Sequence, residues 1–129
     1  MKYLSLDEVM HLAGTPGLIP GGPIVRDLGL LGSAVARPQT TLLDQDAYPD
    51  LWSKTAALCD SISNTQPLLD GNKRLAWMCT VAFLAINGID PFGVSTDNGE
   101  EFVMSFSQGQ HLTIDDIAAR LRALIAAGS

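Results

Sequence analysis

The chain has 129 residues, a length that suits a single domain with one hydrophobic core. Its net charge of −6 argues against DNA or RNA as a direct partner, because proteins that bind nucleic acid broadly present a basic surface. Hydrophobic residues make up 47% of the chain, but Asn87 and Asp90 interrupt the longest apolar run, so no membrane-spanning segment is predicted. The N-terminus has no signal-peptide pattern, and we expect a cytoplasmic protein.

Only two cysteines are present, Cys59 and Cys79. They form no CxxC pair and have no neighbouring cluster of histidines, so the sequence does not point to a zinc site. Each lies in an apolar segment with helical spacing. We expect two buried, reduced thiols that fill space in the core.

The first half of the chain predicts two short helices and a small β element. Ser5 followed by Glu8 is typical of a capping box at the start of a helix. A loop rich in Gly and Pro covers residues 14–25, after which Asp27 can cap a second helix. Residues 40–43 are the only β-like run, which is too short for more than a small hairpin.

Two longer helices are predicted in the middle of the chain. Residues 48–64 carry apolar side chains at helical spacing on one face. Residues 75–88 are apolar on nearly every side, and such a helix must be surrounded by others. We therefore expect it to be the central helix of the fold, ending at Asn87 and Gly88.

Two more helices are predicted near the C-terminus. Asp97 and Glu100 can cap a helix over residues 100–108, and Thr113 and Asp116 can cap the last helix. Because strands and helices do not alternate, we predict one all-α domain, a bundle of about six helices around one buried central helix.

The stretch NTQPLLDGNKRLAW, residues 64–77, joins the two long helices. The first N–H groups of a helix have no internal partner, and the helix dipole adds partial positive charge there, so this end suits an anion. Gly71 allows a ligand to approach closely, and Asn72 can donate hydrogen bonds. Lys73 and Arg74 add positive charge, and an arginine can grip phosphate with two donors.

Asp70, beside these residues, could hold a divalent metal ion that bridges phosphate oxygens. The spacing is neither that of a Walker A loop nor that of a Rossmann fingerprint. From the residues alone, the alternative is a Gly-Asn turn followed by two solvated cations.

The segment PLLDGNKRLAW resembles the signature of the Fic/Doc superfamily, His-x-Phe-x-Asp-Ala/Gly-Asn-Lys-Arg, and in particular its Doc (death-on-curing) branch. The flanking stretches VRDLGLLGSAVARPQTT, YPDLWSKTAALCDSISN and FLAINGID are similar to those of the family and occur in the same order. The resemblance covers essentially the whole chain, residues 1–129, as one Fic/Doc domain.

Doc proteins are small all-helical toxins of Phd-Doc toxin–antitoxin modules. They use ATP to phosphorylate a threonine of elongation factor Tu, which stops translation, whereas Fic proteins transfer AMP to hydroxyl groups. The resemblance therefore implies a bacterial, phage or plasmid toxin that uses ATP and Mg²⁺. It also implies a Phd-like antitoxin whose C-terminal segment folds onto the toxin. A short β flap that docks the target beside the site would fall near residues 37–46.

Carried over to this chain, the resemblance assigns Asp70 to the metal and the catalytic network. It assigns Gly71, Asn72, Lys73 and Arg74 to nucleotide phosphates, with Arg74 also in the catalytic set. The lysine favours the kinase branch, because typical AMP-transferring members have a second glycine in its place.

Two positions depart from the motif. Leu68 replaces the Phe, an apolar exchange that we interpret as a packing change. Gln66 replaces the His that acts as general base, and a carboxamide has no usable basicity. Loss of a general base costs about 10²–10⁴ in rate, so we expect this chain to be inactive or weakly active. Nothing in the sequence places His11 or His111 nearby.

Three hypotheses remain open at this point. The chain is a kinase impaired at its base, an AMP transferase of the Fic type, or a catalytically dead module that binds a partner or nucleotide. The glutamine is either a disabling substitution that lets a toxic protein be produced, or the natural residue of a member retained for binding. We favour the first origin because the rest of the motif is intact.

Overall fold

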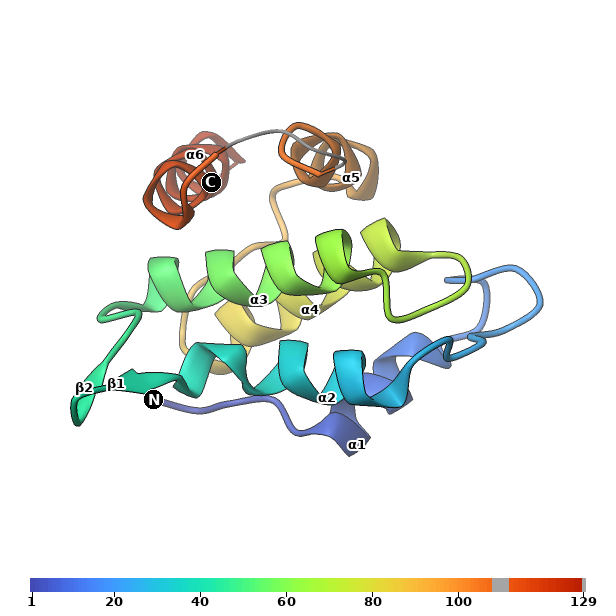
Figure 1. The fold of residues 1–129 in the computed structure, drawn as a ribbon. Helices are drawn as coiled ribbons and strands as arrows, with labels where there is room; N and C mark the ends of the chain where they lie inside the picture. Colours follow the sequence, from blue (N-terminus) through green and yellow to red (C-terminus); the bar gives the residue numbers. More distant parts are fainter. Residues whose placement is uncertain (108–111, 129) are drawn as a thin grey trace.

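The structure is a computed structural model that describes residues 1–107 and 112–128 (Figure 1). The described elements are α1 (Leu6–Ala13), α2 (Leu28–Ala36), the 3₁₀ helix η1 (Arg37–Gln39), β1 (Thr41–Leu42), β2 (Gln45–Asp46), α3 (Leu51–Thr65), α4 (Asn72–Ile86), α5 (Thr96–Met104) and α6 (Ile114–Gly128). Within the described part, the strands contain only two residues each. The prediction of an all-α fold with about six helices is therefore confirmed.

The helices form three layers, with α3 and α4 in the middle (Figure 1). α1 and α2 cover one side of this pair, and α5 and α6 cover the other. The helix predicted to be central, α4, shares that position with α3, which buries ten of its 15 residues against seven of 15 for α4. The burial of α3 is hard to predict from the sequence, because several of its buried residues are polar. Thr55 and Ser63 can be buried because their hydroxyls donate to carbonyls of the same helix.

Side-chain caps begin most of the helices. Ser5, Asp27 and Thr113 cap α1, α2 and α6 as predicted. The predicted start of the next-to-last helix was wrong. α5 begins at Thr96 and is capped by Ser95, rather than by Asp97 or Glu100.

Gly99 lies inside α5 and packs against Trp77. A Cβ at this position would fall 2.0 Å from the Trp77 ring. Close packing against α4 therefore requires glycine at this position. The residues around Gly99 do not predict this contact, because Trp77 is distant in the sequence.

Strands β1 and β2 form an antiparallel hairpin, with Thr41 opposite Asp46. Leu43 and Asp44 form its turn, both with left-handed backbone conformations, φ 52° and φ 63°. The hairpin lies where α3 begins, and the motif follows the other end of that helix (Figure 1). A 15-residue helix is about 20 Å long. The prediction that residues 37–46 lie beside the site is therefore wrong in position, although the hairpin itself exists.

A buried lysine holds the hairpin against α3. Lys54 is only 2% exposed. Its ammonium donates to Asp46 Oδ2 at 3.0 Å, to the Tyr48 carbonyl at 2.6 Å and to the Pro38 carbonyl at 3.3 Å. These acceptors come from both stems of the hairpin, so one cation fixes its two sides.

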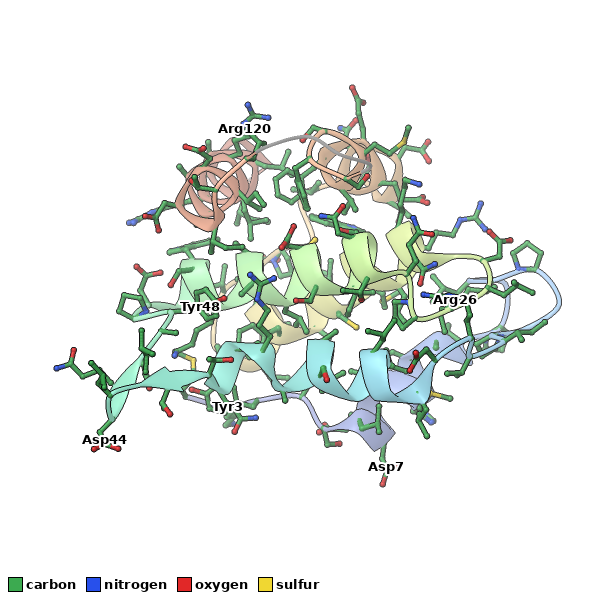
Figure 2. The ribbon with its side chains drawn as sticks, in the orientation of Figure 1. Tyr3, Asp7, Arg26, Asp44, Tyr48 and Arg120 are labelled. Carbon is green, nitrogen blue, oxygen red and sulfur yellow. The ribbon has the colours of Figure 1, made fainter. Side chains whose placement is uncertain are left out.

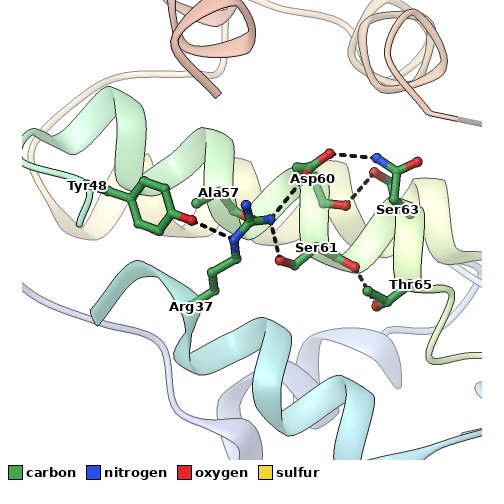
Figure 3. Close-up of polar contacts among 8 residues, drawn as sticks. Arg37, Tyr48, Ala57, Asp60, Ser61, Ser63 and Thr65 are labelled. Atoms are coloured by element: carbon green, nitrogen blue, oxygen red, sulfur yellow. Dashed lines mark hydrogen bonds and ion pairs between the residues drawn. The ribbon is translucent and has the colours of Figure 1, made fainter. Parts of the chain in front are cut away.

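Arg37 joins the base of the hairpin to the middle of α3 (Figure 3). Its guanidinium donates to the Tyr48 hydroxyl at 2.9 Å, to Asp60 Oδ2 at 2.8 Å and to the Ser61 hydroxyl at 2.8 Å. Burial alone would lower the pKa of Arg37, but the bonds to Asp60 and Tyr48 outweigh it and raise the pKa. The group therefore stays charged and structural.

The two thiols lie in the core, as predicted. Cys59 and Cys79 are free and fully buried. Burial raises the pKa of Cys59 to about 12, so its thiol is protonated at neutral pH. None of the described helices is long and apolar enough to span a bilayer.

Candidate active site

A surface hollow of about 430 Å³ lies where α3 ends and α4 begins. It brings together every site residue that the sequence predicted. Its lining comprises Pro20, Ser63, Gln66, Leu69, Asp70, Gly71, Asn72, Lys73, Arg74 and Glu100. Segments far apart in the chain, the loop before α2 and the helix α5, complete its walls.

The first turn of α4 faces this hollow without a side-chain cap. Gly71 is the N-cap residue, with φ 84°, and among the described residues no side chain caps the N–H groups that follow. A Cβ on Gly71 would lie 2.8 Å from Ile19 Cγ1, so both the backbone and the space require glycine. The free N–H groups and the helix dipole make this end of α4 suited to an anion.

The side chain of Asn72 closes the motif loop, and the residue also lines the hollow. Its Oδ1 accepts from the Leu68 N–H and its Nδ2 donates to the Leu68 carbonyl, both at 2.9 Å. One N–H of the Asn72 amide is used in this way, and its second N–H and the backbone N–H remain for a ligand, so the expectation that Asn72 donates to a ligand stays a prediction. Leu68 is 1% exposed, which agrees with a packing role.

The two adjacent cations differ in their surroundings. Arg74 pairs with Glu100 through Nε and Oε1 at 3.2 Å and donates to the Leu18 carbonyl at 3.2 Å. For Lys73, no ion pair or side-chain hydrogen bond occurs with any residue of the described ranges 1–107 and 112–128. Lys73 is thus available for an anion, whereas Arg74 already has an acidic neighbour. Glu100 was not predicted as a site residue, because its pairing partner lies on another helix.

Asp70 is exposed at the rim of the hollow, and its Oδ1 accepts from the Gly71 N–H at 2.9 Å. No group of three or more acidic, His or Cys residues that could hold a metal occurs in the described part of the chain. A single carboxylate suits Mg²⁺ that arrives with phosphate oxygens and water as its other ligands. The donor set therefore fits a metal bound together with a nucleotide.

Gln66 ends α3 in a left-handed conformation, φ 52° and ψ 60°, and its side chain lines the hollow. A carboxamide here can orient a hydroxyl group but cannot take its proton. His11 is exposed on α1 and lines a different hollow, so it lies away from Gln66. His111 lies outside the described residues.

The chain before α2 is paired with the motif loop. Val25 and Leu68 form an antiparallel bridge, and the Leu69 N–H donates to the Ile24 carbonyl at 2.9 Å. Residues 14–25, predicted only as a loop, therefore lie beside the site in place of the hairpin.

Arg26 extends this pairing to the end of α3. Its Nε donates to the Gln66 carbonyl and its Nη2 to the Thr65 carbonyl, both at 2.9 Å. Sequence reasoning missed Arg26, because its partners are about 40 residues away along the chain and it belongs to no motif.

Comparison with known proteins agrees with this geometry. The family model described as the Fic/DOC family matches residues 3–84, which include the whole motif loop. A curated protein named Toxin Doc, from Mycolicibacterium smegmatis (strain ATCC 700084 / mc(2)155), is 42% identical over 128 residues. That match covers 98% of this chain and 95% of the relative. The chain belongs to the Fic/DOC family.

Proposed function

We propose that the chain is a Doc-type toxin, an ATP-dependent protein kinase that phosphorylates a threonine of elongation factor Tu and arrests translation. We further propose that Gln66, in the general-base position, leaves it impaired. The observation that carries this proposal is the uncapped start of α4 with the free Lys73, which opens onto the same hollow as residue 66. The name of the Mycolicibacterium relative supports the toxin class.

In the proposed reaction, the N–H groups of the first turn of α4 and the Lys73 ammonium hold the phosphates of ATP. Asp70 would hold Mg²⁺, which supplies positive charge between phosphate oxygens when it is bound. Arg74 must exchange its contact with Glu100 for a phosphate oxygen. The substrate hydroxyl oxygen forms a bond to the γ-phosphorus as the bond to the ADP oxygen breaks. A histidine at position 66 would accept the hydroxyl proton, whereas with Gln66 the proton passes to water, which slows the step.

We place the target protein beside the loop of residues 14–25, not at the β1–β2 hairpin. Ile24 and Leu69 are paired through their backbones and are 59% and 66% exposed. They offer an apolar surface next to the hollow, where a target threonine could enter. A Phd-like antitoxin would lay its C-terminal segment elsewhere, and the apolar hollow between α1 and α4 is the candidate groove.

The deciding experiment restores the base with Gln66→His. Because histidine is enriched among non-glycine residues with left-handed backbones, the variant should fold without adjusting the main chain. We expect phosphate transfer to elongation factor Tu to rise by about 10²–10⁴, with growth arrest on expression. Gln66→Asn is the matched control, since it also tolerates this backbone but supplies no base, and it should stay inactive.

Labelled ATP separates the alternatives. Transfer of the γ-label to the target supports the kinase, and transfer of the α-label supports AMP transfer of the Fic type. If the Gln66→His variant binds nucleotide but modifies no protein and does not slow growth, the binding-module hypothesis replaces the proposed function. The codon for residue 66 in the native gene then shows whether the glutamine is natural.

A further inference from the structure

Gln66 lines the hollow and has a left-handed backbone conformation, which is unfavourable for a residue other than glycine. A non-glycine residue in the left-handed region is uncommon and persists only when its surroundings fix it. Gln66 follows directly after the last turn of α3, where carbonyl groups lack helical partners. Some contact outside α3 must therefore hold this peptide in place.

Arg26 supplies that contact. It donates to the carbonyls of both Thr65 and Gln66, so two successive peptide planes are bound by one planar guanidinium. The charge also suits the negative end of the α3 dipole. Figure 2 shows Arg26 at this end of α3, far from the hairpin tip marked by Asp44.

The backbone of Arg26 is itself firmly held. The N–H groups of Arg26 and Asp27 both donate to the Pro67 carbonyl, at 2.8 Å and 3.1 Å. The Asp27 carboxylate caps α2 by accepting from the Leu30 N–H at 3.0 Å. The guanidinium therefore projects from a fixed junction between α2 and the motif loop, and it does not line the hollow.

We infer that Arg26 is a positioning residue, which sets the orientation of residue 66 toward the substrate hydroxyl without itself touching the substrate. This inference rests on the proposed function for its kinetic consequence. Its structural consequence, a change in the backbone of residue 66 when Arg26 is removed, can be measured in the chain that carries Gln66.

The kinetic test compares variants in the Gln66→His background. Arg26→Ala should lower kcat about 10- to 100-fold, the size expected when a reacting group is displaced by about 1 Å. The KM for ATP should change less than about twofold, because Arg26 is outside the phosphate site. Arg26→Lys keeps the charge but loses the fork that spans two carbonyls, so its kcat should be intermediate.

Arg122→Ala is the matched control. Arg122 lies over the Trp52 ring at 5.9 Å on the opposite side of α3, so its removal perturbs packing but not residue 66. Its kcat should equal that of the parent. An unchanged kcat in Arg26→Ala, or an equal loss in Arg122→Ala, overturns the inference.

The structural test uses nuclear magnetic resonance of the chain with Gln66 in place. The three-bond coupling between the amide and α protons of residue 66 should depart from its left-handed value in Arg26→Ala and remain unchanged in Arg122→Ala. An unchanged coupling in Arg26→Ala overturns the inference even if kcat falls. If Arg26→Ala does not fold, Arg26→Lys and Arg26→Gln take its place. Failure of Gln66→His to transfer phosphate would defeat the proposed function alone, since the coupling is read independently of activity.

Discussion

The hairpin end and the motif end of the molecule each hold a lysine, and the fold satisfies these two lysines differently. At the hairpin end, Lys54 and Arg37 donate to carbonyl, hydroxyl or carboxylate groups of the hairpin region and of α3. At the motif end, Lys73 has no such partner in residues 1–107 and 112–128, and Arg74 faces an open hollow. Residue type does not separate a structural cation from a functional one here. The contrast is clearest between Lys54, whose donors the fold satisfies, and Lys73, whose donors have no side-chain partner within the described residues, while Arg74 already bonds Glu100 and Leu18.

Removing the structural cation should give the largest effect on folding. Lys54→Ala deletes a buried side chain and leaves the Pro38 and Tyr48 carbonyls without their donor. We expect the free energy of unfolding to fall by about 2–5 kcal/mol, measured by urea denaturation. Asp46→Asn, at a half-exposed carboxylate, should lose less than about 1 kcal/mol. A small loss in Lys54→Ala would contradict the structural role assigned to this end.

Removing the free cation should act on binding instead. Lys73→Ala should weaken ATP binding about 10- to 100-fold, because a hydrogen bond to a charged group contributes about 1.5–3 kcal/mol. The melting temperature should stay within the error of the parent. Isothermal titration gives the affinity, and Lys2→Ala at the exposed N-terminus serves as the control. A Lys73→Ala protein that binds ATP normally would remove the distinction between the two ends.

A methyl group at the start of α4 tests how tightly the hollow is built. Gly71→Ala should destabilise the protein by about 1–3 kcal/mol because of its left-handed backbone. It should also weaken ATP binding, since the new Cβ meets Ile19. Gly88→Ala is a close control, because Gly88 has φ 88° but open space around it. Equal effects of the two substitutions on ATP affinity would show that the contact with Ile19 is unimportant.

The smallest expected effect comes from the acidic neighbour of Arg74. Glu100→Gln removes a competing charge from the hollow, and ATP affinity should rise by about two- to fivefold, in line with an exposed ion pair. Glu101→Gln, the adjacent exposed residue, should leave the affinity unchanged. A fall in affinity for Glu100→Gln would mean that Glu100 assists the ligand instead of competing with it.

The sequence predicted those features that depend on local chemistry. Capping by Ser5, Asp27 and Thr113 and the placement of the motif at a helix start follow from residues a few positions apart. The misplaced features depend on contacts between distant segments. Gly99 is chosen by Trp77, and the hairpin is separated from the site by the whole of α3. Arg26 and Glu100 reach the site only after the chain has folded.

The backbone at residue 66 also affects how the site can change over generations. Histidine and glutamine codons differ at one base, and the left-handed conformation at this position suits histidine. An exchange between the two residues therefore needs no second substitution to restore the fold. Arg26 binds this segment through backbone carbonyl groups, which every residue has. These hydrogen bonds therefore do not depend on the side chain at position 66. If residue 66 acts as proposed, we expect a single mutation to silence or restore proton transfer without changing the fold of the site.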